Sequence, residues 1–233
     1  MDVFGQALTD QFIHNEAEIL WLHNSYDEPE EMPVDIFFRT REEMPSMELM
    51  ALELCKGKIL DIGAGAGSHA LLLQEHKKDV TAMDISADAV QIMQQRGVRN
   101  AVVGDINLHS SEKYDTLLML MNGIGLTGSL EGFKSFLNHA NSMLNRDGQL
   151  IFDSSDIAYL YEGTELPTSP YYGQVSYQYE YKGQKSEWFD WLYLDQNTLI
   201  ATAKSCGWTC EIIFEDEQDQ YLARLFPPKS QLY

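Results

Sequence analysis

Lys58 to Gln74 reads KILDIGAGAGSHALLLQ, in which an apolar stretch runs into a glycine-rich turn and then into a second apolar pattern. Residues 58–62 predict a short buried strand, and the spacing over residues 68–74 predicts a helix. Glycine adopts backbone angles that other residues avoid, and it lets another molecule lie against bare main chain. The turn, made by Gly63, Gly65 and Gly67 at the N-terminus of the helix, therefore predicts a nucleotide-type cofactor site.

The spacing of the glycines distinguishes between cofactors. The dinucleotide fingerprint is G-x-G-x-x-G, and its third glycine allows close packing of the helix. Here Ser68 occupies that third position, and no lysine precedes a hydroxyl residue as a phosphate-cradling loop requires. The turn instead resembles the first motif of the class I S-adenosylmethionine-dependent methyltransferases, whose cofactor carries no phosphate and lays its amino-acid end over such a turn.

The ends of three further predicted strands agree with that resemblance. Residues 79–85 predict a strand that ends at Asp84, where a carboxylate can accept both hydroxyls of a ribose. Residues 100–105 predict a strand that ends at Asp105, and the resemblance implies that this acid contacts the adenine amino group. A strand over 114–120 runs into residues 121–125, which resemble the loop that faces the transferable methyl group.

The resemblance implies a set of cofactor-binding residues at these strand ends: Asp61, Gly63, Ala64, Gly65, Gly67, Asp84, Ile85, Asp105, Ile106, Met121 and Asn122. Each residue also has a structural interpretation. Asp61 can bond the amides of its own turn, and Asp84 can cap the helix that starts near Ser86. The joint pattern is more specific than any single residue, because open parallel sheets bind ligands at these strand ends.

Composition limits the partners. The 233 residues suit one domain, and 36 acidic against 16 basic residues give a formal charge of -20. Such a surface disfavours nucleic acid, whose affinity comes largely from lysine and arginine. We expect a cytoplasmic protein, because no apolar run is long enough for a bilayer and the N-terminus lacks a secretory signal.

Cysteine and histidine spacing predicts neither a metal site nor a disulfide. The three cysteines, Cys55, Cys206 and Cys210, are expected as free thiols in a reducing compartment. The histidines are scattered along the sequence, and His69 fits a helix face without a partner carboxylate.

The whole pattern predicts a doubly wound α/β fold. We expect a seven-stranded, mostly parallel sheet with an antiparallel last strand, an N-terminal helical cap and an inserted β-hairpin lid. The predicted parts are a cap over residues 1–56, a cofactor-binding core over 57–153, an aromatic hairpin over 154–194, and a C-terminal helix and strand pair over 195–233. Within the cap, residues 4–22 and 46–54 show helical patterns.

The cap and the hairpin lie outside the core that the resembled family shares, and we expect them to carry the substrate chemistry. An arginine of the cap, Arg39 or Arg41, can pair with the carboxylate of the cofactor, although a surface role is the favoured interpretation. In the hairpin, aromatic residues alternate over 175–181 and 187–194. They predict cross-strand packing, a lid over the acceptor, or both if one edge lines the pocket, with Tyr177 and Trp191 as candidates for the lid.

We therefore expect methyl transfer from S-adenosylmethionine to a nitrogen or oxygen of a small-molecule acceptor, by in-line displacement in a shielded pocket. The catalytic residues and the oligomeric state stay unassigned. The polar candidates near the reacting group are Asn122, Asp153 and Asp156. Two alternatives remain: an NAD(P)-dependent oxidoreductase, which shares the strand, turn and ribose acid, and a non-catalytic nucleotide-binding protein of the same fold.

Overall fold

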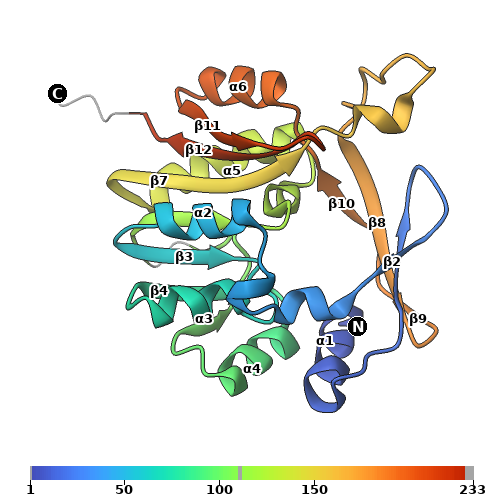
Figure 1. Ribbon diagram of the computed structural model, residues 1–233. Helices are drawn as coiled ribbons and strands as arrows, with labels where there is room; N and C mark the ends of the chain where they lie inside the picture. The colour runs from blue at the N-terminus through green and yellow to red at the C-terminus, as the bar shows by residue number, and fades with distance from the viewer. Residues whose placement is uncertain (1, 110–111, 229–233) are drawn as a thin grey trace.

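The computed structural model describes residues 2–109 and 112–228, and a seven-stranded sheet forms its centre (Figure 1). The strand order is β11-β12-β7-β6-β3-β4-β5. The strands are β3 (Lys58–Ile62), β4 (Asp79–Asp84), β5 (Ala101–Val103), β6 (Tyr114–Met119), β7 (Leu144–Ser155), β11 (Thr209–Glu215) and β12 (Gln220–Phe226). Strands β3 to β7 pair in parallel, and β12 pairs antiparallel with both β7 and β11. The expected sheet and its antiparallel last strand are confirmed.

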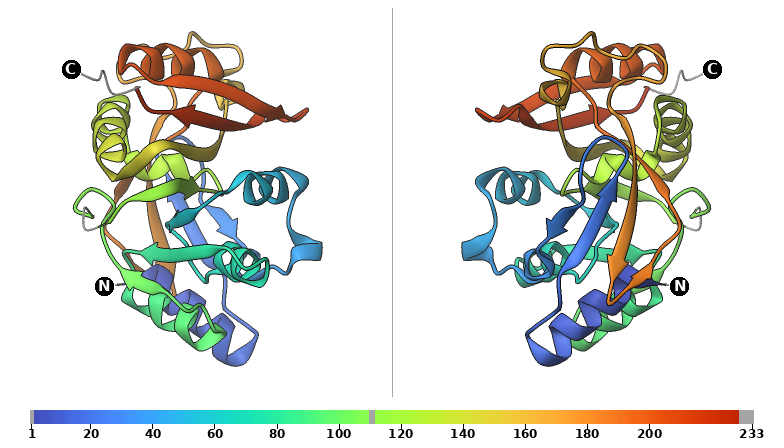
Figure 2. Two further views of the ribbon diagram at one scale, coloured as in Figure 1. Left: turned by 90° about the vertical axis from the view of Figure 1, so that its left-hand side faces the viewer. Right: turned by 90° about the vertical axis from the view of Figure 1, so that its right-hand side faces the viewer.

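Helices cover both faces of this sheet, as the edge-on views of Figure 2 show. They are α2 (Ser46–Leu54), α3 (Ser68–Glu75), α4 (Ala87–Arg96), α5 (Leu130–Met143) and α6 (Gln196–Ser205). Buried side chains of α5 and α6 share one apolar cluster with the sheet, and those of α2, α3 and α4 share another. Chain order reverses between β3 and β6, which creates the switch point where ligands bind in open α/β sheets.

A second sheet combines the N-terminal segment with the insertion. Its order is β10-β8-β1-β2, with β9 paired to β8. The strands are β1 (Leu20–Asn24), β2 (Glu30–Met32), β8 (Gln174–Tyr181), β9 (Gln184–Lys185) and β10 (Phe189–Leu192). In Figure 1 this sheet stands at the end toward which the arrows of β3 and β4 point, so it faces the carboxyl ends of the parallel strands.

The helix expected over residues 4–22 is wrong in its second half. Helix α1 (Val3–His14) ends where Asn15 adopts the left-handed conformation, with φ of 52°. The chain then enters β1, in which Leu22 pairs with Tyr179 of β8. Leu20 and Leu22 are buried, so their alternation belongs to a strand, which pairs with nearby β2 on one side and with distant β8 on the other.

Short 3₁₀ helices complete the chain: η1 (Val34–Phe38), η2 (Arg41–Glu43), η3 (Gly123–Thr127) and η4 (Ala158–Tyr161). Helix α1 packs against α4 and β8, which fixes it beside the mouth of the site. Within residues 2–109 and 112–228, no helix combines the length and the apolar character needed to cross a bilayer.

Candidate active site

A cavity of about 660 Å³ lies between the two sheets, at the carboxyl ends of the parallel strands. Nine of the eleven residues assigned to the cofactor in the sequence line it. They are Asp61, Gly63, Ala64, Gly65, Asp84, Ile85, Asp105, Ile106 and Met121. The strand-end pattern therefore gathers these residues around one space.

The glycine turn is held against the end of β4 by Asp84. One carboxylate oxygen, Oδ2, accepts a hydrogen bond of 2.8 Å from the backbone N–H of Gly65. The other accepts one of 2.9 Å from the N–H of Ser86. Ser86 itself caps α4 with its hydroxyl, so the capping interpretation of Asp84 is wrong. Burial raises the pKa of Asp84 despite these bonds.

Gly63 and Gly65 adopt φ of 70° and 55°, in the region that favours glycine. Gly67 also has positive φ, but it lies outside the cavity wall, where an added Cβ would come within 2.8 Å of Met93 and 3.0 Å of Val98. The third glycine thus allows α3 to start close against α4, while the first two face the cavity.

Asp61 is the most unusual group at the site. Its side chain is buried at the end of β3, and Oδ2 has no hydrogen-bond partner among the described residues. Burial raises the pKa of this carboxyl to about 6, with the nearby charge of Asp84 acting in the same direction and that of His69 opposing it. A buried carboxylate oxygen without a hydrogen-bond donor destabilises the folded protein, so a ligand that donates to this oxygen would bind with a more favourable free energy.

A buried charge cluster lies beside Asp61. Glu48 of α2 accepts a hydrogen bond of 2.6 Å from Nη2 of Arg39 at one oxygen, and its other oxygen lies 2.8 Å from Nε2 of His69. Burial opposes ionisation of Glu48, but His69 and Arg39 outweigh it and lower the pKa of Glu48. Burial also acts to lower the pKa of His69, but the bond to Glu48 and the charges of Asp61 and Glu48 raise it overall.

This cluster corrects the expectation that His69 has no partner carboxylate, and it selects between the two arginines. Arg39 lines the cavity, and its buried Nε has no acceptor among the described residues. Arg41 is exposed in η2. The sequence missed Glu48 because it lies on another helix, 21 positions from His69, and no motif links the two.

Another part of the cavity wall is formed by the residues that follow β4 and β5. Asp105 accepts hydrogen bonds at Oδ1 from the backbone and side-chain nitrogens of Asn107, at 2.8 and 3.0 Å. Ile106 is buried beside it, whereas Ile85 lines the cavity with 73% of its surface exposed. An open apolar surface flanked by an acid suits a flat base with an amino group.

After β6 the chain makes a constrained loop. Met121 and Asn122 both adopt positive φ, at 63° and 53°. The N–H of Asn122 donates to Oδ2 of Asp153 at 2.9 Å, and its side-chain oxygen accepts from the hydroxyl of Ser155 at 3.0 Å. Met121 therefore points into the cavity, while Asn122 is turned toward β7 and does not line it.

The polar candidates for a base lie elsewhere. Asp153, Asp156 and Asn122 are all absent from the cavity wall. Burial raises the pKa of Asp153 to about 6, and its Oδ1 has no partner among the described residues, but it faces the loop backbone and not the cavity.

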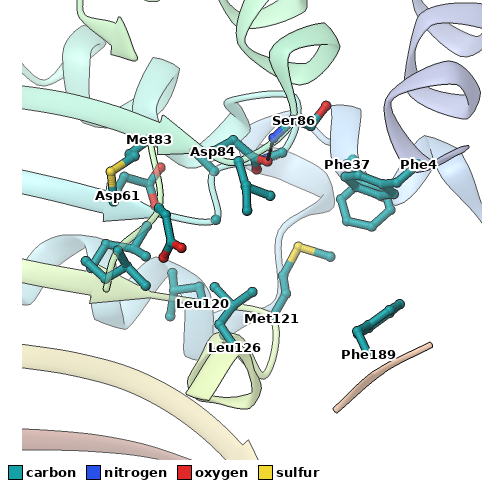
Figure 3. A pocket seen from close by; sticks show the side chains of 18 of the residues that line it. Phe4, Phe37, Asp61, Met83, Asp84, Ser86, Leu120, Met121, Leu126 and Phe189 are labelled. Carbon is teal, nitrogen blue, oxygen red and sulfur yellow. Dashed lines mark hydrogen bonds between the residues drawn. The ribbon is translucent and has the colours of Figure 1, made fainter. Parts of the chain in front are cut away.

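The second sheet and the N-terminal segment supply an aromatic wall, which we define as Phe4, Phe37, Tyr179, Phe189 and Trp191. Figure 3 shows Phe4, Phe37 and Phe189 across the cavity from Leu126, with Met121 between them. Tyr177 is not part of this wall. It is buried and its hydroxyl bonds those of Tyr26 and Tyr193, so the aromatic stripe divides into one edge that lines the cavity and one that packs.

Comparison with solved structures identifies the family. The chain is 39% identical to a methyltransferase of Bacteroides fragilis whose crystal structure contains S-adenosyl-L-homocysteine, with a TM-score of 0.90 over 97% of this chain and 95% of that one. This chain belongs to the S-adenosylmethionine-dependent methyltransferases. Residues 59–148 also match the model of a methyltransferase domain.

Two other relatives of this methyltransferase are more distant. The ribosomal RNA small subunit methyltransferase C of Klebsiella pneumoniae is 34% identical over 103 residues, which make up 41% of this chain and 30% of that protein. The alignment thus spans less than a third of the curated relative. The methyltransferase CcbJ of Streptomyces caelestis shares the fold, with a TM-score of 0.62 over 80% of this chain and 94% of that one at 13% identity.

Proposed function

We propose that this protein transfers the methyl group of S-adenosylmethionine to a nitrogen or oxygen of a small molecule. One observation carries the proposal. The cavity wall contains two buried atoms without a hydrogen-bond partner among the residues that the structure describes: the acceptor Oδ2 of Asp61 and the donor Nε of Arg39. The methionine end of the cofactor carries an ammonium and a carboxylate, which satisfy these two atoms with complementary charge.

The other contacts follow along the cavity. The bare backbone of Gly63 and Gly65 receives the chain between the amino acid and the ribose. Asp84 accepts from the ribose hydroxyls, and Asp105 faces the amino group of the adenine. Met121 then lies beside the sulfur, at the inner end of the acceptor space.

Bound S-adenosylmethionine supplies an electrophilic methyl group on a positively charged sulfur. The protein holds the acceptor in line with that methyl group at a reacting distance of about 3 to 3.5 Å and excludes water from the space between them. Asp153 accepts from the backbone N–H of Asn122 and Ser155 donates to its side-chain oxygen, so the surface beside the methyl group is set before the acceptor arrives.

The charge of the protein supports a small acceptor over ribosomal RNA. The cavity is lined by five aspartates, whereas Arg39 is the one lysine or arginine among its described lining residues, and it is already bound to Glu48. An RNA would have to bring phosphates toward this acidic mouth without the cations that normally neutralise them.

Calorimetry and a turnover assay test the proposal. We expect S-adenosylhomocysteine to bind with a dissociation constant at least tenfold below that of NAD, roughly 1.4 kcal/mol in binding free energy. Addition of S-adenosylmethionine and a metabolite extract should release S-adenosylhomocysteine faster than the extract alone. Tighter binding of NAD would support the oxidoreductase, and cofactor binding without turnover would support a non-catalytic protein.

A further inference from the structure

The acceptor half of the cavity combines aromatic faces with negative charge. The five residues of the aromatic wall come from α1, η1, β8 and β10, and each is partly exposed. From this combination we infer that the acceptor is a small organic amine, held as a cation against the aromatic wall. The inference rests on the proposed function and names its substrate class.

The aromatic wall is continuous. Phe37 meets Phe4 edge-on with ring centroids 5.0 Å apart, and Phe4 stacks on Tyr179 at 5.4 Å. Tyr179 lies 5.1 Å from Phe189, which meets Trp191 edge-on at 6.2 Å. The rings thus extend from the glycine turn, where Phe37 would come within 3.4 Å of a Cβ at Gly65, to the far side of the cavity.

The Trp191 end of the wall is held in place by η3, which begins within the methyl-facing loop. Strand β10 packs against η3, and Gly125 of η3 lies so close to the indole that an added methyl group would overlap it. A glycine that makes room for one ring indicates that the position of Trp191 is set by packing. The ring is therefore in place before an acceptor binds.

Charge on the wall has one sign. Asp2 lines the cavity beside Phe4. Asp190 also lines it, but its carboxylate accepts a hydrogen bond of 2.8 Å from the hydroxyl of Ser176, and alternation along β10 places it on the face of the strand opposite to Phe189 and Trp191. Aromatic faces attract ammonium groups, and nearby carboxylates add to that attraction. Among the described lining residues, Arg39 and His69 are the basic side chains that could pair with an acidic acceptor, and both contact Glu48 at the cofactor end.

The reaction also favours nitrogen over oxygen at this wall. The amine first releases a proton to water at the exposed edge. Its lone pair then forms the bond to the methyl carbon while the carbon–sulfur bond breaks and its electron pair stays on sulfur. Positive charge moves from sulfur to nitrogen and is present throughout, so the acidic, aromatic surroundings suit the transition state as well as the product. A phenolate would instead arrive as an anion, next to carboxylates.

Binding to the protein saturated with S-adenosylhomocysteine tests the inference without turnover. The probes are two matched sets, benzylamine with benzyl alcohol and benzoate, and butylamine with butanol and butanoate. Benzyltrimethylammonium serves as a cation that has no nucleophile. We expect the cation to bind at least about tenfold more tightly than its neutral and anionic counterparts in each set. Stronger binding of an alcohol or a carboxylate, or no measurable binding of any cation, would overturn the inference.

Variants locate the binding surface. Trp191→Leu should weaken binding of benzyltrimethylammonium by about 3- to 30-fold, whereas Trp191→Phe should retain most of it. Phe189→Leu is a second variant with the same expectation if the first folds poorly. Trp188→Leu is the matched control, because Trp188 belongs to the same segment, is 53% exposed and does not line the cavity.

The two proposals fail in different ways. Trp191→Leu could weaken the binding of S-adenosylmethionine without weakening that of S-adenosylhomocysteine or of the organic cations. In that case the aromatic wall binds the sulfonium of the cofactor, and the amine inference is wrong. If S-adenosylhomocysteine does not bind the wild-type protein at all, the proposed function is wrong. Methylation of the alcohols but not of the amines would preserve the proposed function and reject the amine.

Discussion

Replacing Asp61 by asparagine tests whether this buried carboxyl is maintained for the cofactor at a cost in stability. Burial raises its pKa from 3.8 to about 6, so ionised Asp61 destabilises the ligand-free protein by about 3 kcal/mol at neutral pH. The folded state binds this proton more tightly than the unfolded chain does. Stability therefore increases as pH falls through 6 and is lost as pH rises.

The size of the effect follows from the two pKa values. Between pH 7.5 and pH 5 the ligand-free protein should gain on the order of 1 kcal/mol from Asp61, or roughly 2 to 4 °C in melting temperature. Asp61→Asn should remove that gain. The same substitution should also reduce the contribution of His69 to the pH dependence of stability, because the pKa of His69 is raised partly by the charge of Asp61.

Lower pH should weaken cofactor binding, although it stabilises the ligand-free protein. An ionised Asp61 accepts a hydrogen bond from the cofactor ammonium. Asp61→Asn should therefore weaken the binding of S-adenosylhomocysteine by roughly 1.5 to 3 kcal/mol, or about 10- to 100-fold in the dissociation constant. In the wild type the affinity should fall as pH drops below about 6. Thermal melts from pH 5 to 7.5 and calorimetry on the same preparations measure both effects.

Asp153→Asn is the matched control. Asp153 is as deeply buried, its pKa is also raised to about 6 by burial, and it does not line the cavity. This variant should lose the same pH-dependent stability. Its S-adenosylhomocysteine affinity should change by less than about twofold, because asparagine keeps a side-chain oxygen that can accept from the N–H of Asn122. Unchanged affinity and an unchanged pH slope in Asp61→Asn would refute the reasoning for Asp61.

Three further substitutions address the rest of the cofactor site. Asp84→Ala should weaken S-adenosylhomocysteine by roughly 1.5 to 3 kcal/mol in calorimetry, and an unchanged dissociation constant in a folded variant would reduce Asp84 to a support for the turn. Gly65→Val should abolish binding because it places a branched side chain at φ of 55° against the cofactor, whereas Gly183→Val, at φ of 73° with open space around it, should cost stability alone. Glu48→Gln should weaken S-adenosylhomocysteine by about tenfold and lower the pKa of His69 in NMR titration, and a lower melting temperature without either change would assign Glu48 to packing.

The cofactor half of the site was predictable because its signals are local. The turn, the strand before it and the helix after it lie within residues 58–75, so periodicity and glycine spacing place them together. The acids at the ends of β4 and β5 follow from the same rule, since parallel strands present their carboxyl ends at one edge. Family resemblance then supplied the role of each position.

The charge cluster was not predictable, because pairing between distant elements leaves no periodic trace. Glu48 bonds an arginine nine positions earlier and a histidine twenty-one positions later, through side chains on α2, on α3 and on the segment after η1. Exposed charges and buried charge clusters look alike in a sequence. Only the packing of α2 beside the turn gives Arg39 its place in the cavity.

The acceptor half depends on contacts of still longer range. Leu22 of β1 pairs with Tyr179 of β8, so the N-terminal segment and the insertion form a single sheet across the mouth. Local periodicity over residues 4–22 favoured a continuous helix. Of the two strands that pair with β1, β2 is short, and β8 lies more than 150 positions away. The same pairing decides the aromatic stripe: Tyr179 faces the cavity and Tyr177 is buried among tyrosines. Under the proposed function, acceptor specificity is set where the N-terminal segment meets the insertion, and changes to β1 should alter acceptor binding through Tyr179 without touching the glycine turn.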